Sequence, residues 1–260
     1  MPARHYTFQI RHQLTVLAVA FSCWIFVFAS SGKTQKSAST VAMADSASVR
    51  FLMGMAPSEK TMISVPTAYC SKPLQLQKTV WQAYLNMHDA AAKSGVKLTI
   101  ISGMRDFTHQ MGIWNGKYSK LAAKGITGEA AVRNILKYSS MPGTSRHHWG
   151  TDMDLNSLEP GFFLSGDGLK MLTWMRLHAG EFGFCEVYSP RSTGRTTGYE
   201  PEPWHWSYMP LAKQYLQQYK DKIGYNLIQG DPSMKKVSGI LYANKVRIKE
   251  DFIQGINQCQ

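Results

Sequence analysis

The sequence predicts an α+β domain in which helices precede a set of short strands. Three observations support this fold class. Apolar residues recur at helical spacing in the first segments, whereas alternation with a period of two occurs at 151–156 and 204–208. Helices and strands do not alternate along the chain as they would in repeated βαβ units. About 210 residues follow a polar linker, which is enough for one domain with its own core.

The first 50 residues are expected to lie outside that domain. Arg4 and Arg11 precede an uncharged apolar run of about 16 residues, shorter than the ~20 residues of a membrane-spanning helix. Small residues follow the run, as signal peptidase requires. We therefore expect residues 1–31 to be a signal peptide cleaved after Ser31, with an uncleaved anchor as the alternative. Residues 32–50 are rich in Ser, Ala and Lys and are expected to form a flexible linker.

The rest of the chain divides into a domain at 51–224 and a C-terminal extension at 225–260 that we expect to pack on it. The first helix is predicted at 76–93, because its apolar residues share one helical face and Gly95 can end it. The later elements are expected in this order: a strand at 96–102, helices at 106–123 and 128–138, a strand at 151–156, a helix at 167–181, strands at 184–188 and 204–208, and a helix at 211–223.

Side chains that can bind a metal lie on two of these strands. Alternation places Asp152 and Asp154 on one face of the first strand, and it places His205 on the face of its own strand opposite two tryptophans. His147 precedes Gly150 in a segment with turn residues, so we expect it to reach the same site from a loop. The pattern therefore predicts that two strands and a loop bring ligands to one place.

The residue types indicate zinc. Two imidazoles and one carboxylate suit zinc, and three protein ligands leave one tetrahedral position for water or substrate, as in catalytic rather than structural sites. His147, Asp154 and His205 are the candidate ligands, and Glu202 is a free carboxylate that can carry a proton. His148 is the rival of His147 as a ligand, and is otherwise interpreted as a surface or supporting imidazole.

A family resemblance follows from three blocks taken together. Their sequences are Ser102-Gly-Met-Arg105-Asp-Phe-Thr-His-Gln110, Ser145-x-His147-x-x-Gly150-x-x-x-Asp154 and Glu202-x-x-His205. In this order they resemble the zinc D-alanyl-D-alanine carboxypeptidases and dipeptidases related to VanY and VanX, in a superfamily with lysostaphin-like endopeptidases and the hedgehog signalling domain. The resemblance covers residues 76–210, about half of the chain. It implies a small, mostly antiparallel sheet flanked by helices.

The resemblance implies a role for each matching residue. It makes His147, Asp154 and His205 the ligands of one Zn²⁺, and it makes Glu202 the general base and acid. The implied enzyme is a zinc metallopeptidase that removes the terminal D-alanine from a peptidoglycan stem peptide. An endopeptidase, a dipeptidase, a non-catalytic zinc-stabilised module that binds the cell wall and a zinc hydrolase of another amide remain alternatives.

Three further residues receive substrate-binding roles from the resemblance. Arg105 would face the carbonyl or carboxylate of the substrate, and Ser145 and Gln110 would donate or accept supporting hydrogen bonds. Two positions depart from the family pattern, which frequently has an aromatic residue at Met104 and a small residue at Asp152. Asp152 could hold a ligand histidine, pair with an arginine or compete for the metal.

Charge and targeting indicate an exported protein with an anionic partner. The formal net charge is +12, and it is +10 without residues 1–31. A basic surface favours cell-wall polymers, whereas the scattered lysines and arginines argue against nucleic acid. Arg191 and Arg195 lie in a loop that could close over an acidic peptide or be a solvated connection. We expect a monomer in the periplasm or cell envelope, with no membrane span after signal cleavage.

Three cysteines remain after the predicted cleavage: Cys70, Cys185 and Cys259. This number allows one disulfide and one free thiol in an exported protein, and the sequence leaves the pairing open. None has CxxC spacing, which disfavours a structural metal held by cysteines.

Overall fold

A four-stranded antiparallel sheet carries the strands on which ligands were predicted. The computed structural model describes residues 47–56 and 60–259. The order of the strands in the sheet is β3 (Ile100–Ser102), β4 (Asp152–Leu155), β6 (His205–Tyr208) and β5 (Phe184–Glu186). A second antiparallel sheet pairs β1 (Met62–Ser64) with β2 (Gln75–Gln77). The predicted α+β class with a small antiparallel sheet is confirmed.

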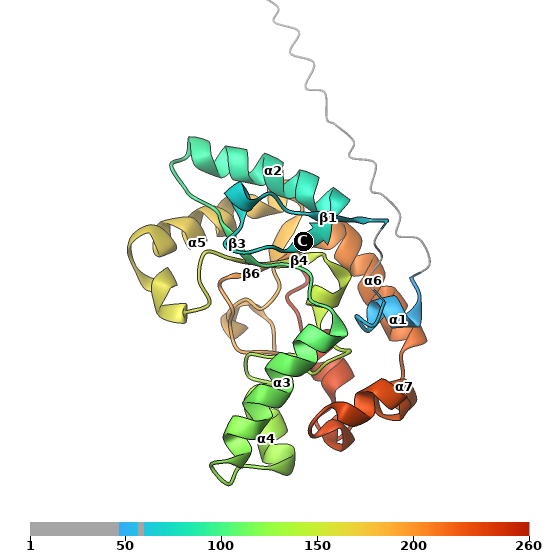
Figure 1. Ribbon diagram of the computed structural model, residues 1–260. Helices are drawn as coiled ribbons and strands as arrows, with labels where there is room; N and C mark the ends of the chain where they lie inside the picture. The colour runs from blue at the N-terminus through green and yellow to red at the C-terminus, as the bar shows by residue number, and fades with distance from the viewer. Residues whose placement is uncertain (1–46, 57–59, 260) are drawn as a thin grey trace, which may run out of the picture. The chain divides into compact units, whose positions relative to one another are not determined.

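Helices surround the four-stranded sheet. In Figure 1, α2 (Lys78–Lys93) lies along one side of it, and α3 (Phe107–Ala122) and α4 (Gly128–Ile135) extend from the opposite side. The remaining longer helices are α5 (Gly166–His178) and α6 (Met209–Lys222). The apolar face of α2 is buried as its spacing predicts, and its fully buried residues are Val80, Tyr84, Met87 and Ala91. The helices and the sheet together enclose one hydrophobic core.

The ends of several elements differ from the prediction. Residues 75–77 form β2 instead of the first turn of α2, because Leu76 pairs with Ile63 of β1. Only Ile100–Ser102 of the strand predicted at 96–102 pairs within the sheet as β3. α6 begins at Met209, ahead of the predicted 211, because Pro210 occupies its first turn, where the missing N–H costs nothing. The order and type of the other predicted elements are confirmed.

The N-terminal predictions fall mostly outside the described residues. The signal peptide predicted at 1–31 and most of the linker predicted at 32–50 lie there. The last residues of that linker are part of the fold, since α1 (Val49–Leu52) begins among them and the Ser48 side chain caps it. Among the residues that the structure describes, no helix is both long and apolar enough to span a bilayer.

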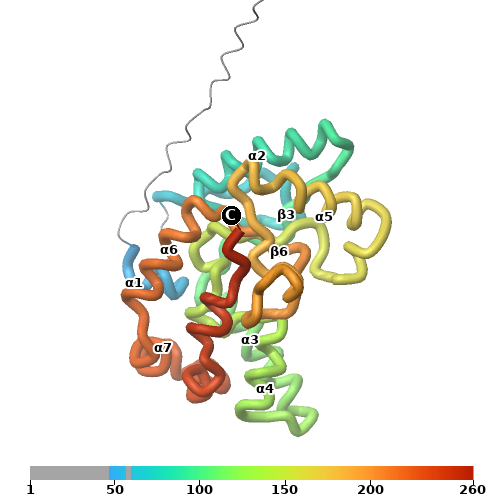
Figure 2. Tube along the Cα trace, turned by 180° about the vertical axis from the view of Figure 1, so that it is seen from behind, coloured from blue at the N-terminus to red at the C-terminus, as the bar shows by residue number. Residues whose placement is uncertain are grey.

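Residues 225–259, which we call the extension, contact the preceding part of the described chain, since the Trp114 indole donates to the Ser238 carbonyl at 2.8 Å. The extension contains α7 (Tyr225–Gly230) and several single-turn helices, and it ends in a π-helix, η8 (Ile248–Ile253). Figure 2 shows this red segment running up to an end beside the sheet. A disulfide between Cys185 of β5 and Cys259 fixes that end, and Cys70 is a buried free thiol. The structure thus selects one of the pairings that the sequence left open.

Candidate metal centre and active site

The register of β4 and β6 brings two predicted ligands face to face. Asp154 lies directly opposite His205, and Asp152 lies opposite Ser207. The strand pleat turns these side chains to one side of the sheet, while Met153 and Trp206 pair on the other side, in the core. The alternation predicted from the sequence therefore positions the site.

His147 comes from a short helix and not from the loop that the turn residues suggested. It lies in the 3₁₀ helix η2 (Arg146–Trp149), where the His148 amide donates to the Ser145 carbonyl at 3.2 Å. Gly150 ends this turn at φ 67°, and its amide donates to the His147 carbonyl at 3.2 Å. A Cβ on Gly150 would come within 2.8 Å of Met62, so both the backbone angle and the packing favour glycine.

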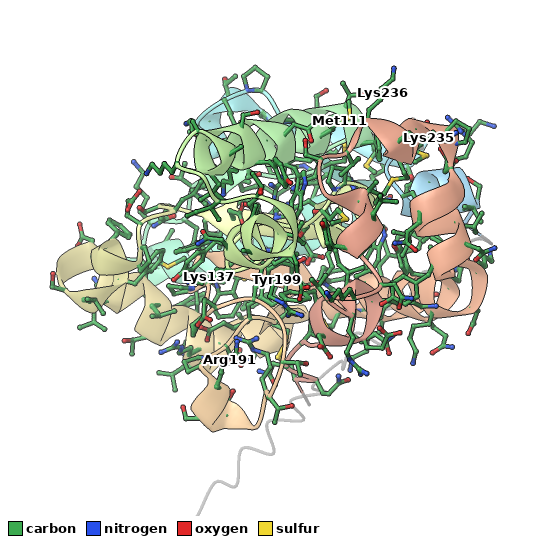
Figure 3. All side chains as sticks on the ribbon, turned by 90° about the horizontal axis from the view of Figure 1, so that it is seen from below. Met111, Lys137, Arg191, Tyr199, Lys235 and Lys236 are labelled. Carbon is green, nitrogen blue, oxygen red and sulfur yellow. A yellow bond between two sulfur atoms is a disulfide. The ribbon has the colours of Figure 1, made fainter. Side chains whose placement is uncertain are left out.

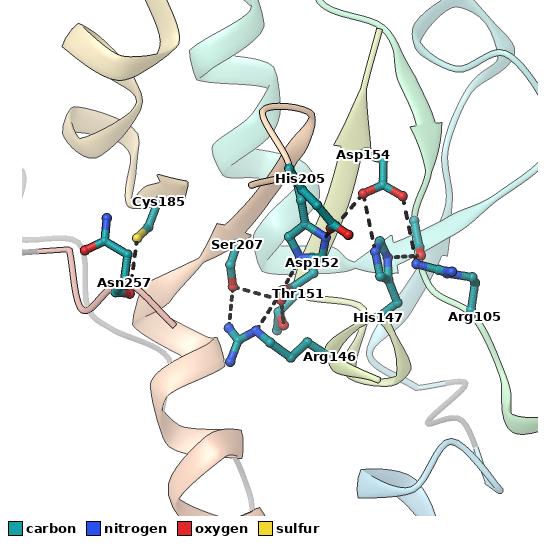
Figure 4. A network of polar contacts seen from close by, with 12 residues as sticks. Arg105, Arg146, His147, Thr151, Asp152, Asp154, Cys185, His205, Ser207 and Asn257 are labelled. Atoms are coloured by element: carbon teal, nitrogen blue, oxygen red, sulfur yellow. Dashed lines mark hydrogen bonds and ion pairs between the residues drawn. The ribbon is translucent and has the colours of Figure 1, made fainter. Parts of the chain in front are cut away.

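The three predicted ligands converge on one point (Figure 4). One ligand atom from each of His147, Asp154 and His205 lies within 4.8 Å of the others, and all three residues are buried. His147 Nε2 is 3.4 Å from Asp154 Oδ1, and His205 Nδ1 is 3.3 Å from the same oxygen. Among the described residues, His147 Nε2 and Asp154 Oδ1 have no hydrogen-bond partner.

This arrangement fits a zinc ion. Buried polar atoms in proteins are nearly always satisfied, so two unsatisfied atoms aimed at one point indicate a missing partner. A cation would satisfy both of them, and two nitrogens with one carboxylate oxygen form a donor set that zinc prefers. The donor types and their unsatisfied atoms therefore fit a zinc site.

Each ligand imidazole is oriented by a second hydrogen bond. His147 Nδ1 donates to the Gly103 carbonyl at 2.8 Å, which leaves Nε2 for the metal. His205 uses the opposite tautomer, because its Nε2 donates to Asp152 Oδ2 at 2.9 Å and leaves Nδ1 for the metal. Burial lowers the pKa of His147, as expected for a ring that is neutral in the fold.

Asp152 adopts two of the three roles that the sequence allowed. Besides holding His205, its Oδ2 accepts from Arg146 Nε at 2.9 Å, and its Oδ1 accepts from Thr151 Oγ1 at 2.7 Å and Ser207 Oγ at 2.8 Å. Burial opposes ionisation of this carboxyl, but Arg146 and His205 outweigh burial and hold its pKa well below the usual value. Asp152 lies outside the ligand cluster, so it does not compete for the metal.

Glu202 and Arg105 lie beside the candidate ligands. Glu202 Oε2 is 3.4 Å from His205 Nδ1, and burial raises the pKa of the Glu202 carboxyl. Arg105 follows β3 directly, and its NH2 group lies 3.9 Å from Asp154 Oδ2. Figure 4 shows Arg105 and His205 on opposite sides of Asp154. A carboxylate and a guanidinium thus border the metal position.

The two supporting residues differ in what they can contact. Gln110 is fully buried, and its Oε1 accepts from Arg105 NH1 at 3.1 Å while its Nε2 donates to the Ser140 carbonyl at 2.7 Å. Both polar ends of Gln110 are therefore used within the protein, and this residue orients Arg105. Ser145 is also buried, and its hydroxyl has no hydrogen-bond partner among the described residues.

His148 points away from the metal centre. Its Nδ1 donates to the Arg105 carbonyl at 2.6 Å and its Nε2 accepts from the Gly143 amide at 3.1 Å. Burial lowers the pKa of His148 to about 4, so the ring is a neutral structural link. The idea that it lies at the surface is wrong, because the η2 turn buries it completely.

A cleft opens over this centre. Its volume is about 480 Å³, and Arg105, Asp154 and Glu202 line it together with residues that the sequence did not single out for the site: Ile113, Lys117, Tyr138, Ser139, Leu158, Pro160 and Trp204. A smaller pocket of about 20 Å³ is lined by residues that include His147, Glu202 and His205. That size holds about one water molecule. The added residues lie in ordinary helix and loop patterns, so no sequence signal marks them.

Aromatic rings connect the extension to the ligand set. The ring of Tyr188 lies 4.6 Å from His205 and 4.8 Å from Tyr199, and Tyr199 lies 5.2 Å from Phe252 of η8. Figure 3 shows Tyr199 beside Lys137 on this side of the molecule. Tyr188 and Tyr199 also line the smaller pocket, so the extension packs against one of its wall residues.

The loop before Glu202 is fixed by its own arginines. The buried Arg195 guanidinium donates to the carbonyls of Ser189, Thr197 and Tyr199, and Arg191 donates to those of Thr196 and Gly198. Arg195 is therefore committed to the loop and is not available to an acidic peptide.

The chain is similar to several known carboxypeptidases. The family model VanY, described as D-alanyl-D-alanine carboxypeptidase, matches residues 73–211. A D-alanyl-D-alanine carboxypeptidase of Enterococcus faecalis is 32% identical over 126 residues, or 48% of this chain and 45% of the relative. The chain spans about half the length of the curated relatives it matches.

Two solved structures resemble this one over much of the described domain. VanYB in complex with D-alanine-D-alanine is 25% identical, with a TM-score of 0.48 over 64% of this chain and 87% of the other. A mutant VanY D,D-pentapeptidase in complex with Zn(II) is 26% identical, with a TM-score of 0.45 over 59% of this chain and 93% of the other.

Proposed function

This chain belongs to the VanY family of D-alanyl-D-alanine carboxypeptidases, and from that premise we propose that it is a zinc-dependent enzyme that removes the terminal D-alanine of peptidoglycan stem peptides. One observation carries the proposal: the ligand atoms of His147, Asp154 and His205 lie within 4.8 Å of one another while Glu202 stays outside the set. A structural zinc site would have no need of this free carboxylate.

His147 Nε2, an Asp154 oxygen and His205 Nδ1 would hold the metal. When bound, zinc supplies a Lewis acid that polarises the scissile carbonyl and makes water more acidic. Asp152 and the Gly103 carbonyl hold the two rings in the tautomers that the site needs.

Glu202 is the proton carrier in this proposal. Its carboxylate accepts a proton from the attacking water and donates it to the amine of the leaving D-alanine. Burial raises its pKa, which brings the carboxyl closer to the range in which one group can accept and return a proton near neutral pH. The smaller pocket beside Glu202 has room for the water that Glu202 deprotonates.

Arg105 stabilises the negative charge that develops on the carbonyl oxygen. Arg105 lines both the cleft and the smaller pocket, and Gln110 fixes the orientation of its guanidinium. A preorganised donor of this kind contributes roughly 2.7–4 kcal/mol to transition-state stabilisation.

We also propose that the enzyme acts outside the cytoplasm. The Cys185–Cys259 disulfide supports this, because such bonds form and persist mainly in oxidising compartments. The N-terminal signal pattern and the basic composition agree with export to the periplasm or cell envelope.

A muropeptide digest tests the proposed function. The full-length protein, loaded with zinc and checked for metal content, is incubated with monomeric pentapeptide, crosslinked dimer and free D-alanyl-D-alanine. Loss of one alanine from the pentapeptide supports the carboxypeptidase. Separation of crosslinked stems would show an endopeptidase instead, and cleavage of the free dipeptide alone would show a dipeptidase. Bound zinc without hydrolysis of any of the three would favour a binding module.

A further inference from the structure

Lys117 is a cation in the cleft that the proposed chemistry does not use. It lines the cleft wall with Arg105, Asp154 and Glu202. Its position follows from α3, on which Gln110, Ile113 and Lys117 share the face turned toward the site. Along this face, α3 therefore presents Gln110, which orients Arg105, then the apolar side chain of Ile113, and then the ammonium group of Lys117.

The Lys117 ammonium has spare hydrogen-bonding capacity. An ammonium carries three donors, and Lys117 Nζ uses one of them on Ser139 Oγ at 2.5 Å. In the part of the chain that the structure describes, it forms no ion pair with a carboxylate. The side chain is exposed in the cleft, but the ammonium end lies against the wall, and its burial there lowers the pKa of Lys117. An added carboxylate would offset the cost of this desolvation by attracting the ammonium.

Ser139 places this ammonium close to the metal centre. Ser139 lines the smaller pocket together with His147, Glu202 and His205. The next residue, Ser140, accepts the hydrogen bond from Gln110 that fixes the orientation of Arg105. Ser139 and Ser140 thus hold Lys117 and Arg105 against the same wall of the cleft. In a peptide substrate, the terminal carboxylate is only a few bonds from the scissile carbonyl. A carbonyl beside Arg105 would therefore bring the carboxylate near Lys117.

We propose that Lys117, together with the Ser139 hydroxyl, binds the C-terminal carboxylate of the substrate and so makes the enzyme select free peptide ends. Arg105 contacts Asp154 and Gln110 and is assigned to the scissile carbonyl in the proposed chemistry, whereas Lys117 feels the charge of Glu202 but forms no ion pair with a carboxylate among the described residues. This inference rests on the proposed function and deepens it, because it explains how one cleft could prefer a carboxypeptidase substrate over an internal bond.

The test uses a pair of substrates that differ in one group. The first is an N-acetylated tripeptide ending in D-Ala-D-Ala, with the C-terminal carboxylate as its sole carboxylate, and the second is its C-terminal amide. The full-length zinc-loaded protein is compared with Lys117→Met, Lys117→Arg and Lys120→Met. Lys120 lies on the same helix but outside the cleft lining, so it is the matched control for loss of one positive charge.

We expect wild type to prefer the acid to the amide. Lys117→Met should lower the ratio of kcat/KM for the acid to kcat/KM for the amide by roughly tenfold to a hundredfold, because one charge-assisted hydrogen bond contributes that much. The change should appear mainly in KM. Lys117→Arg should restore part of the ratio, and Lys120→Met should leave it unchanged. An unchanged ratio in Lys117→Met, or an equal loss on both substrates, would overturn the inference.

A binding measurement separates this inference from the proposed function. If wild type cleaves neither substrate, the proposed function has failed, and calorimetry of D-Ala-D-Ala binding to zinc-loaded wild type and Lys117→Met still decides the role of Lys117. Weaker binding in the variant supports the carboxylate site. Equal binding in the two proteins, or none in wild type, refutes it.

Discussion

Replacement of Asp152 by Asn should weaken both the fold and the metal site. Four donors surround this fully buried carboxylate: Arg146 Nε, His205 Nε2, Thr151 Oγ1 and Ser207 Oγ. The amide of Asn can turn its oxygen toward the two N–H groups, and the hydroxyls can rotate to accept from its NH₂ group. The variant therefore keeps the shape and removes the charge.

The magnitude follows from these contacts. Arg146 is 2% exposed and loses its carboxylate partner, and such a loss in a buried pair costs about 3–5 kcal/mol. For a domain of this size that corresponds to a fall in Tm of roughly 10 °C. His205 donates to a neutral oxygen instead of a carboxylate, so its ring becomes a less basic ligand. Loss of such an outer partner lowers metal affinity by roughly tenfold to a hundredfold.

Two assays and a matched control test this reasoning. Urea unfolding of the metal-free protein measures stability, and competition with a chromophoric chelator measures the zinc Kd. The control is Glu186→Gln, which neutralises a carboxylate that accepts two hydrogen bonds from Arg176, at 2.7 Å and 2.8 Å, away from the ligands. It should leave the zinc Kd unchanged. A zinc Kd within threefold of wild type in Asp152→Asn would refute the proposed role of Asp152.

Three further outcomes are expected. Glu202→Ala should keep stoichiometric zinc and lose turnover by at least roughly a hundredfold, since it removes a general base that binds no metal; activity within tenfold of wild type in the digest would contradict that role. The double variant Cys185→Ser, Cys259→Ser opens a link across 74 residues and should lower the unfolding free energy by about 4 kcal/mol in the loop-entropy model. Calorimetric unfolding checks this, and an unchanged Tm would argue against it. Gly150→Ala forces a side chain into a left-handed conformation and toward Met62, so it should cost at least about 1–2 kcal/mol and weaken zinc binding through His147. Equal stability and zinc affinity in this variant would show that η2 tolerates the change.

The clustering of the three candidate ligands could be predicted from the sequence because it depends on local rules. Strand alternation puts Asp154 and His205 on the faces where the structure finds them, and antiparallel pairing makes them neighbours. The choice between His147 and His148 depends on the η2 turn, since each ring points where that short helix directs it. Turn residues alone do not distinguish a loop from such a helix.

Other features depend on contacts between distant segments. Leu76 fits the helical spacing of α2, and only pairing with Ile63 makes it part of a strand. The disulfide partner of Cys185 is decided by where the last residues of the chain pack. Lys117 looks like an ordinary surface lysine until the packing of α3 turns it into the cleft. Sequence patterns carry no signal for such long-range placement.

The row of aromatic rings from Phe252 through Tyr199 and Tyr188 to His205 has a practical consequence for the design of truncated fragments of this protein. The family match stops at residue 211, yet the ring that supports the wall behind the ligands comes from about forty residues later. A recombinant fragment trimmed to the matched boundaries would leave Tyr199 without its outer neighbour and β5 without its covalent tether. A fragment that is meant to keep both contacts therefore has to include the chain as far as Cys259.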